Sequence, residues 1–185
     1  PIKSVENELR QTYTDILSTN AYAEYAFGKY LNLRVTGGIT KIKARDEKFN
    51  NSQTRAGSPL TTTGQNNGIN GSVDYDERTS FLNENTLTYS RTFNNTHSLN
   101  VLTGFTAQKS TSSSFGARAI FLPNEALGLA GLDEGQPQRV SSSTSSSVLA
   151  SFLARANYAY RSKYLITASI SADGSSKFAP ANRWS

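Results

Sequence analysis

The side chains best able to do chemistry in this chain are few and scattered. His97 is the single histidine among 185 residues, and the chain has no cysteine, which excludes disulfides and thiolate metal sites. A Ser-His-Asp triad or a histidine-based metal site would have to form around His97, which lies in a short polar stretch without suitable partners nearby. We therefore interpret His97 as a structural turn residue and expect no catalytic residues.

The acidic stretch of Asp74, Asp76 and Glu77 is the nearest approach to a metal site. A calcium loop of the EF-hand kind requires the spacing Asp-x-Asp-x-Asp-Gly, which is missing here. We interpret these groups as solvated loop carboxylates. The sequence predicts no metal-binding and no cofactor-binding residues.

The glycines are also better explained by turns than by ligand binding. Glycines 64, 68 and 71 lie in an Asn-rich stretch that no helix is expected to follow, so a phosphate-binding loop is not predicted. Asp173-Gly174-Ser175-Ser176 is a more specific motif at the end of an expected strand. Aspartate and glycine suit a turn at such a position, so we favour a structural role over ligand contact.

Composition narrows the class of protein. The chain carries a formal net charge of +5, but its basic residues are scattered, which gives nucleic-acid binding no support. No stretch approaches the about 18 apolar residues that a transmembrane helix needs. The chain begins at Pro1 without a signal-peptide pattern, and we expect it to be an internal piece of a longer protein.

Residues 148–175 predict one β-hairpin whose two faces suit different solvents. Apolar side chains such as Phe152 and Ile170 alternate with polar ones such as Arg155 and Ser169, and successive side chains of a strand point to opposite sides. Arg161-Ser162-Lys163 is short enough to force antiparallel pairing of the two arms.

The same layout recurs twice earlier in the chain. Hairpins are predicted near residues 19–45 and 79–110, and long loops rich in Asn, Gly, Ser and Thr near 46–78 and 110–147. Arms of more than ten residues exceed the usual soluble strand of about 5–6 and match the about 9–11 residues of a tilted membrane-crossing strand. Alternation of short turns and long loops is typical of outer-membrane barrels, whose short turns are periplasmic.

Aromatic residues gather beside the expected short turns. Examples are Phe27, Phe93, Tyr160 and Tyr164. Such a gathering is typical of an interfacial aromatic girdle. A soluble sheet capped by tyrosines is the alternative.

One irregularity concerns the register of the first hairpin. Lys41, Lys43 and Arg45 follow Gly37-Gly38 in the alternation phase that had been apolar. A β-bulge at the glycines would return these cations to the polar face, and we favour it. Without a bulge the three cations face outward, where they could meet lipid phosphates.

Three stretches resemble the SusC/RagA family of TonB-dependent outer-membrane transporters. The strongest is Arg155–Phe178 followed by Asn182-Arg183-Trp184, which is similar to the family pattern Arg-x-Asn-Tyr-x-Tyr, Lys-Tyr-Leu and Asp-Gly-Ser-Ser-x-Phe. The second is Asn83–Tyr89 with His97–Gly104, and a weaker third runs from Glu24 to Arg34. Ser171 departs from the family, which more often has an arginine ahead of Ala-Asp-Gly.

The resemblance implies a fold and a set of partners. We expect an all-β, antiparallel transmembrane β-barrel segment of about six strands, with residues 1–185 belonging to one receptor-like barrel domain of a large plugged barrel. It implies a bacterial outer-membrane location, import of glycans or peptides, a SusD-like surface lipoprotein, and TonB acting through parts outside this chain.

Two other classes of protein stay open at this point. One is a different outer-membrane barrel, either a siderophore-type receptor or a small porin-like barrel. The other is a non-transport extracellular adhesin rich in β-structure.

Overall fold

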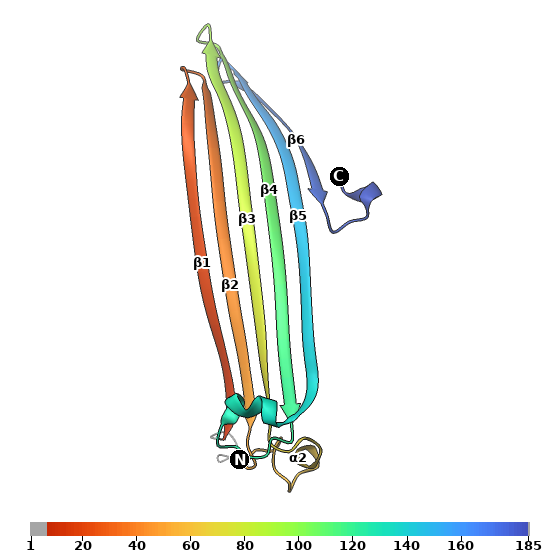
Figure 1. The fold of residues 1–185 in the computed structure, drawn as a ribbon. Helices are drawn as coiled ribbons and strands as arrows, with labels where there is room; N and C mark the ends of the chain where they lie inside the picture. Colours follow the sequence, from red (N-terminus) through yellow and green to blue (C-terminus); the bar gives the residue numbers. More distant parts are fainter. Residues whose placement is uncertain (1–6, 185) are drawn as a thin grey trace. The chain divides into compact units, whose positions relative to one another are not determined.

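A computed structural model describes residues 7–184 and contains a single sheet of six strands. The strands lie side by side in the order β1-β2-β3-β4-β5-β6, as Figure 1 shows. Their bounds are β1 Glu8–Phe27, β2 Leu31–Asn50, β3 Asn70–Phe93, β4 His97–Ile120, β5 Gln136–Tyr160 and β6 Tyr164–Ser175. The predicted fold class, an all-β antiparallel segment of about six strands, is confirmed.

Among the described residues the sheet ends at β1 on one side and at β6 on the other. An unpaired edge exposes a row of backbone N–H and C=O groups and invites pairing with another chain. The described segment therefore has two edges that a complete barrel would pair. No helix in the described part of the chain is long and apolar enough to cross a membrane.

Connections of three residues, at 28–30, 94–96 and 161–163, join the strands of each hairpin, and the last is the predicted turn Arg161-Ser162-Lys163. Asn94 and Asn95 have φ of 50° and 53°, and Arg161 and Ser162 have φ of 50° and 54°. Two successive positive φ values are typical of the type I′ turn, whose twist matches that of the flanking strands. The turn 161–163 closes with a hydrogen bond from Lys163 N to the oxygen of Tyr160.

The strands are longer than predicted, and the long loops correspondingly shorter. Residues 46–78 and 110–147 were expected to be loops, but only 51–69 and 121–135 connect strands. The first connection contains the short helix α2 (Thr62–Asn67), and the second the 3-10 helix η1 (Gly128–Glu134). A further 3-10 turn, η2 (Pro180–Asn182), follows β6.

The serine-rich run at 140–147 explains this error. Residues 141–147 are serine or threonine in both alternation phases, which removes the periodic signal that marks a half-buried strand. In the structure the run pairs with β4 through hydroxyl contacts, Ser114 to Ser143 at 2.8 Å and Ser113 to Thr144 at 3.3 Å. Pairing with a neighbouring strand, rather than burial, makes it β-structure.

The bulge predicted at Gly37-Gly38 is wrong. β2 is one continuous strand from Leu31 to Asn50. Side-chain contacts between β1 and β2 keep one register on both sides of the glycines, since Glu24 pairs with Arg34 at 3.5 Å and Ser18 with Thr40 at 3.1 Å. Further from the glycines, the Thr12 hydroxyl donates to Oδ1 of Asp46 in the same register.

Lys41, Lys43 and Arg45 consequently stay in the phase of Val35 and Ile39. Two of these cations are held there by carboxylates. Lys41 pairs with Glu77 at 2.8 Å, and Arg45 pairs with Glu47.

The chain divides into two compact units along its strands. The first, the loop-end unit, holds residues 41–78 and 112–145 and the chain up to Ile16. The second, the turn-end unit, holds residues 17–40, 79–111 and the chain from Ser146. The loop-end unit contains a small core of Phe49, Ala119 and Leu122, against which Leu9, Ile69, Leu129 and Leu132 pack.

Candidate functional site

The strands present two chemically different faces. Phe152 of β5 is paired with Ala172 of β6, and Arg155 is paired with Ser169. Because side chains alternate along a strand, these two pairs lie on opposite faces of the sheet. We call them the apolar face and the polar face.

The apolar face is continuous across the turn-end unit. Phe152 contacts Phe105 of β4 with ring centroids 4.9 Å apart, which places the apolar phase of β4 on the same face. Large apolar groups here are exposed, for example Ile170 at 73% and Ile166 at 65%. A row of exposed aliphatic side chains of this kind marks a surface that contacts a membrane or another protein.

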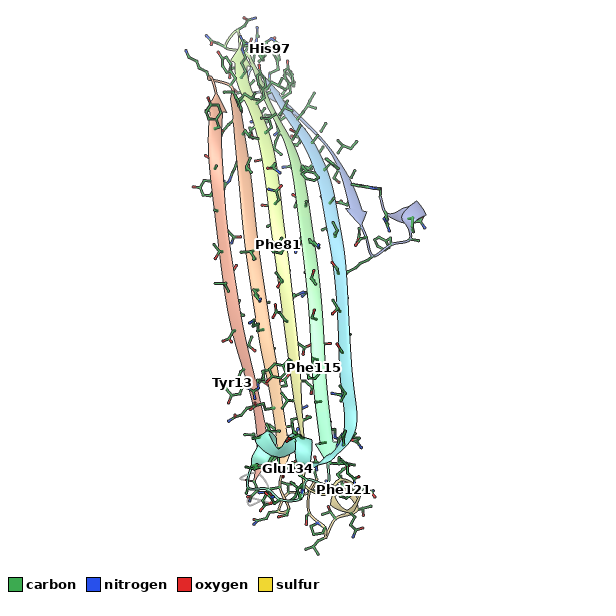
Figure 2. The ribbon with its side chains drawn as sticks, in the orientation of Figure 1. Tyr13, Phe81, His97, Phe115, Phe121 and Glu134 are labelled. Atoms are coloured by element: carbon green, nitrogen blue, oxygen red, sulfur yellow. The ribbon has the colours of Figure 1, made fainter. Side chains whose placement is uncertain are left out.

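Aromatic side chains of this face lie around His97, which Figure 2 labels beside the short turns. His97 is the first residue of β4, and its Nδ1 forms a hydrogen bond with the Tyr158 hydroxyl at 2.6 Å. Its ring also lies 5.0 Å from that of Tyr160, which stacks on Tyr164 at 6.4 Å. His97 is therefore built into an aromatic belt rather than a bare turn.

The loop-end unit carries a second set of exposed aromatic side chains, which stand in the same alternation phase of their strands as the side chains of the apolar face. Tyr13 of β1 and Phe115 of β4, labelled in Figure 2, line a hollow of about 730 Å³ together with Tyr75. The Arg45 guanidinium lies 5.3 Å from the Tyr75 ring centroid. Glu77 also lines this hollow, and the hydrogen bond from Lys41 lowers the pKa of its carboxyl below the usual value.

The polar face of the loop-end unit contains a separate cavity of about 560 Å³, which we call the polar cavity. Every lining residue is polar or glycine: Lys48, Asn50, Asn70, Gly71, Ser72, Asp74, Arg118, Gln138 and Arg139. Three of these side chains are cations and one is an anion. The cavity is therefore a concave polar site with an excess of positive charge.

The anion of the polar cavity is bound to one of its cations. Arg139 donates from Nη2 to Oδ1 of Asp74 at 2.6 Å. These residues come from β5 and β3, and Gly116 of β4 lies between them. Lys48 of β2 and Arg118 of β4 are then the two cations in excess.

Two asparagines fix the wall of the polar cavity. Asn50 donates to Asn70 Oδ1 at 3.0 Å, and Asn70 donates to the backbone oxygens of Ala56 and Gly68 at 3.0 and 2.8 Å. These bonds tie the ends of β2 and β3 to the connection 51–69. Asn50 Oδ1 is buried without a hydrogen-bond partner among the described residues.

A smaller hollow of about 250 Å³ has most of its lining on the polar face, and we call it the serine groove. Its polar lining consists mainly of hydroxyls and charged groups, with Asp76 and Arg78 from β3 and Ser112, Ser114, Ser143 and Ser145 from β4 and β5. The polar face thus offers hydrogen-bonding groups in two hollows of the loop-end unit.

No protein-family profile matches the chain. The TonB-dependent receptor P39 of Formosa agariphila is 31% identical over 157 residues, which is 84% of this chain and 15% of the relative. The TonB-dependent receptor P3 of the same organism is 30% identical over 184 residues, or 98% of this chain and 17% of the relative.

The fold agrees with that of a solved transporter. The RagAB peptide transporter superposes with a TM-score of 0.84 at 20% identity, over 98% of this chain and 20% of that chain. The chain is similar in sequence to a segment of these TonB-dependent receptors, and its fold is that of a barrel segment of the RagAB transporter. It spans less than a fifth of the length of the curated relatives it matches.

The three predicted acidic residues do not share one cavity. Asp74 lines the polar cavity, whereas Asp76 and Glu77 both line the serine groove, and Glu77 pairs with Lys41. No group of three or more His, Cys, Asp or Glu side chains in residues 7–184 could hold a metal ion.

The remaining motifs of the chain have local structural contacts. Gly68, with φ of 56°, ends helix α2, and the Thr61 hydroxyl accepts from Gly64 N at its start. Gly174 pairs with Trp184 in an isolated bridge, and Ser175 N donates to the oxygen of Arg183 at 2.9 Å. The Asp173–Ser176 motif therefore joins the end of β6 to the turn that follows it.

Sequence reasoning missed the cations of the polar cavity. Lys48, Arg118 and Arg139 are far apart in the chain, and none lies in a recognisable motif. Each stands near the end of a long strand, and only the lengths and pairing of those strands reveal that they meet.

Proposed function

We propose that this chain is part of the wall of a TonB-dependent transporter in a bacterial outer membrane, which imports a glycan or a peptide. All 185 residues would belong to one barrel domain. Transport, rather than an enzymatic reaction, would be the activity of the whole protein.

The two-faced sheet is the observation that carries the proposal. An outer-membrane barrel turns apolar side chains to lipid and polar side chains to its lumen, with aromatic girdles at the interfaces. The apolar face of the turn-end unit, with the His97 belt, suits lipid, and the polar face suits a lumen. Strands of 20–25 residues, such as β1 and β5, exceed the about 9–11 residues needed to span the bilayer.

The proposed partners follow from the family. A SusD-like surface lipoprotein would cover the loops at the extracellular end, and TonB would act through parts of the protein outside this chain. Substrate would contact the polar face, where the polar cavity and the serine groove lie.

The test uses the full-length protein. We expect it in the outer-membrane fraction, with electrophoretic migration that changes on heating, as a folded barrel requires. Deletion of its gene should abolish uptake of a glycan or peptide that the wild type imports. Migration unaffected by heating would contradict the barrel and favour an adhesin, and unchanged uptake of all such nutrients would contradict the transport function.

A further inference from the structure

We propose that the polar cavity binds the carboxylate of an acidic oligosaccharide. This inference rests on the proposed function, because it names the class of substrate that the polar face would select. It depends on three features of the cavity: its charge, its lining and its internal ion pair.

The charge of the cavity favours an anion. Lys48, Arg118 and Arg139 face a single carboxylate, that of Asp74. A concave site lined by one sign of charge concentrates oppositely charged ligands. Guanidinium and ammonium groups form their strongest hydrogen bonds with carboxylates and similar oxyanions.

The Asp74–Arg139 pair directs the anion toward the other two cations. At 2.6 Å from Asp74 Oδ1, the Arg139 guanidinium already has a carboxylate partner. Lys48 and Arg118 line the same cavity, and no ion pair is found for either among the described residues. A ligand carboxylate is therefore expected to contact Arg118 and Lys48 first.

The lining favours an oligosaccharide over a peptide. A peptide side chain such as leucine gains affinity by burying apolar surface, and the cavity offers no apolar side chain for that purpose. Its neutral side chains are instead the amides of Asn50, Asn70 and Gln138 and the hydroxyl of Ser72. Amides and hydroxyls both donate and accept hydrogen bonds, as the hydroxyls of a sugar require.

The experiment measures binding to the purified full-length protein by isothermal titration calorimetry. The probes are trigalacturonic acid, neutral maltotriose, and a tri-glutamate peptide of similar charge. We expect trigalacturonic acid to bind more tightly than either of the others, and its affinity to fall as salt is raised. The substitutions Arg118→Gln and Lys48→Gln should each weaken that binding about tenfold.

Lys163→Gln is the matched control, because it removes a cation from the short turn 161–163 and should leave the affinity unchanged. Heat-modifiable migration of each variant shows that the barrel is folded. Equal affinity for trigalacturonic acid and maltotriose, or an unchanged affinity in folded Arg118→Gln, would overturn the inference. Tighter binding of the peptide would overturn the choice of oligosaccharide.

Failure of the inference can be distinguished from failure of the proposed function. If the protein is an outer-membrane barrel that imports a neutral glycan, the function stands and the acidic substrate class is wrong. If trigalacturonic acid binds but gene deletion leaves all uptake unchanged, the cavity chemistry stands and the transport function is wrong.

Discussion

Arg139 of β5 reaches across β4 to Asp74 of β3, with Nη2 and Oδ1 2.6 Å apart, and the strand between them carries a glycine at the crossing point. A Cβ at Gly116 would lie 2.2 Å from Asp74 Oδ1 and 3.2 Å from Arg139 Nη2. The pair exists in this geometry because position 116 has no side chain. One glycine thus sets the charge distribution of the polar cavity.

Gly116→Ala should displace the Asp74–Arg139 pair. Both side chains are partly exposed, so we expect the free energy of unfolding to fall by only about 0.5–1 kcal/mol. Denaturant titration of the full-length protein in lipid vesicles measures this change. Gly37→Ala is the control, because a Cβ there would meet nothing within 4 Å, and a loss as large in the control would refute the role of Gly116.

Tyr158→Phe tests the hydrogen bond that anchors His97 in the aromatic belt. The hydroxyl lies 2.6 Å from His97 Nδ1 in a partly buried site, so its removal should cost about 1 kcal/mol of unfolding free energy. The same denaturant titration provides the measurement. Tyr164→Phe removes a hydroxyl for which no hydrogen bond is found among the described residues, and it should be nearly neutral. A cost as large for Tyr164→Phe would show that loss of the hydrogen bond to His97 is not the cause.

The sequence predicted local features of this fold better than distant ones. Arg161-Ser162-Lys163 and its flanking alternation determine a hairpin within about 30 residues, and the observed register of β5 and β6 agrees with the predicted antiparallel pairing. The strand segment at 140–147 was missed because serine stands on both of its faces, so apolar and polar residues do not alternate there.

The polar cavity was beyond prediction for a different reason. Lys48, Arg118 and Arg139 meet through the registers of successive strand pairs, and the predicted bulge at Gly37-Gly38 alone would have shifted Lys48 to the opposite face. A site whose residues come from several strands can be predicted only if the register of every strand pair between them is predicted correctly.

Ser162→Gly should stabilise the third hairpin. Ser162 has φ of 54°, a left-handed conformation that costs a non-glycine residue about 1–2 kcal/mol. Part of this gain is lost to the greater freedom of glycine in the unfolded chain, so a net increase of about 0.5–1 kcal/mol is expected. Ser169→Gly, in the interior of β6, should instead destabilise, and a gain in both variants would contradict a turn-specific effect.

Gly174→Ala should detach the segment that follows β6. A Cβ at Gly174 would lie 2.8 Å from the Trp184 ring, which also contacts Phe152 with centroids 5.9 Å apart. Overpacking of this kind typically costs about 1–3 kcal/mol, and moving the indole should break the hydrogen bond from Ser175 N to Arg183. Hydrogen exchange by mass spectrometry should therefore show faster exchange in residues 175–184 while the turn 94–96 exchanges as before. Unchanged protection of 175–184 would mean that the Trp184 contact does not hold the segment, and that the Asp173–Ser176 motif owes its contacts to the backbone pairing of β5 and β6 alone.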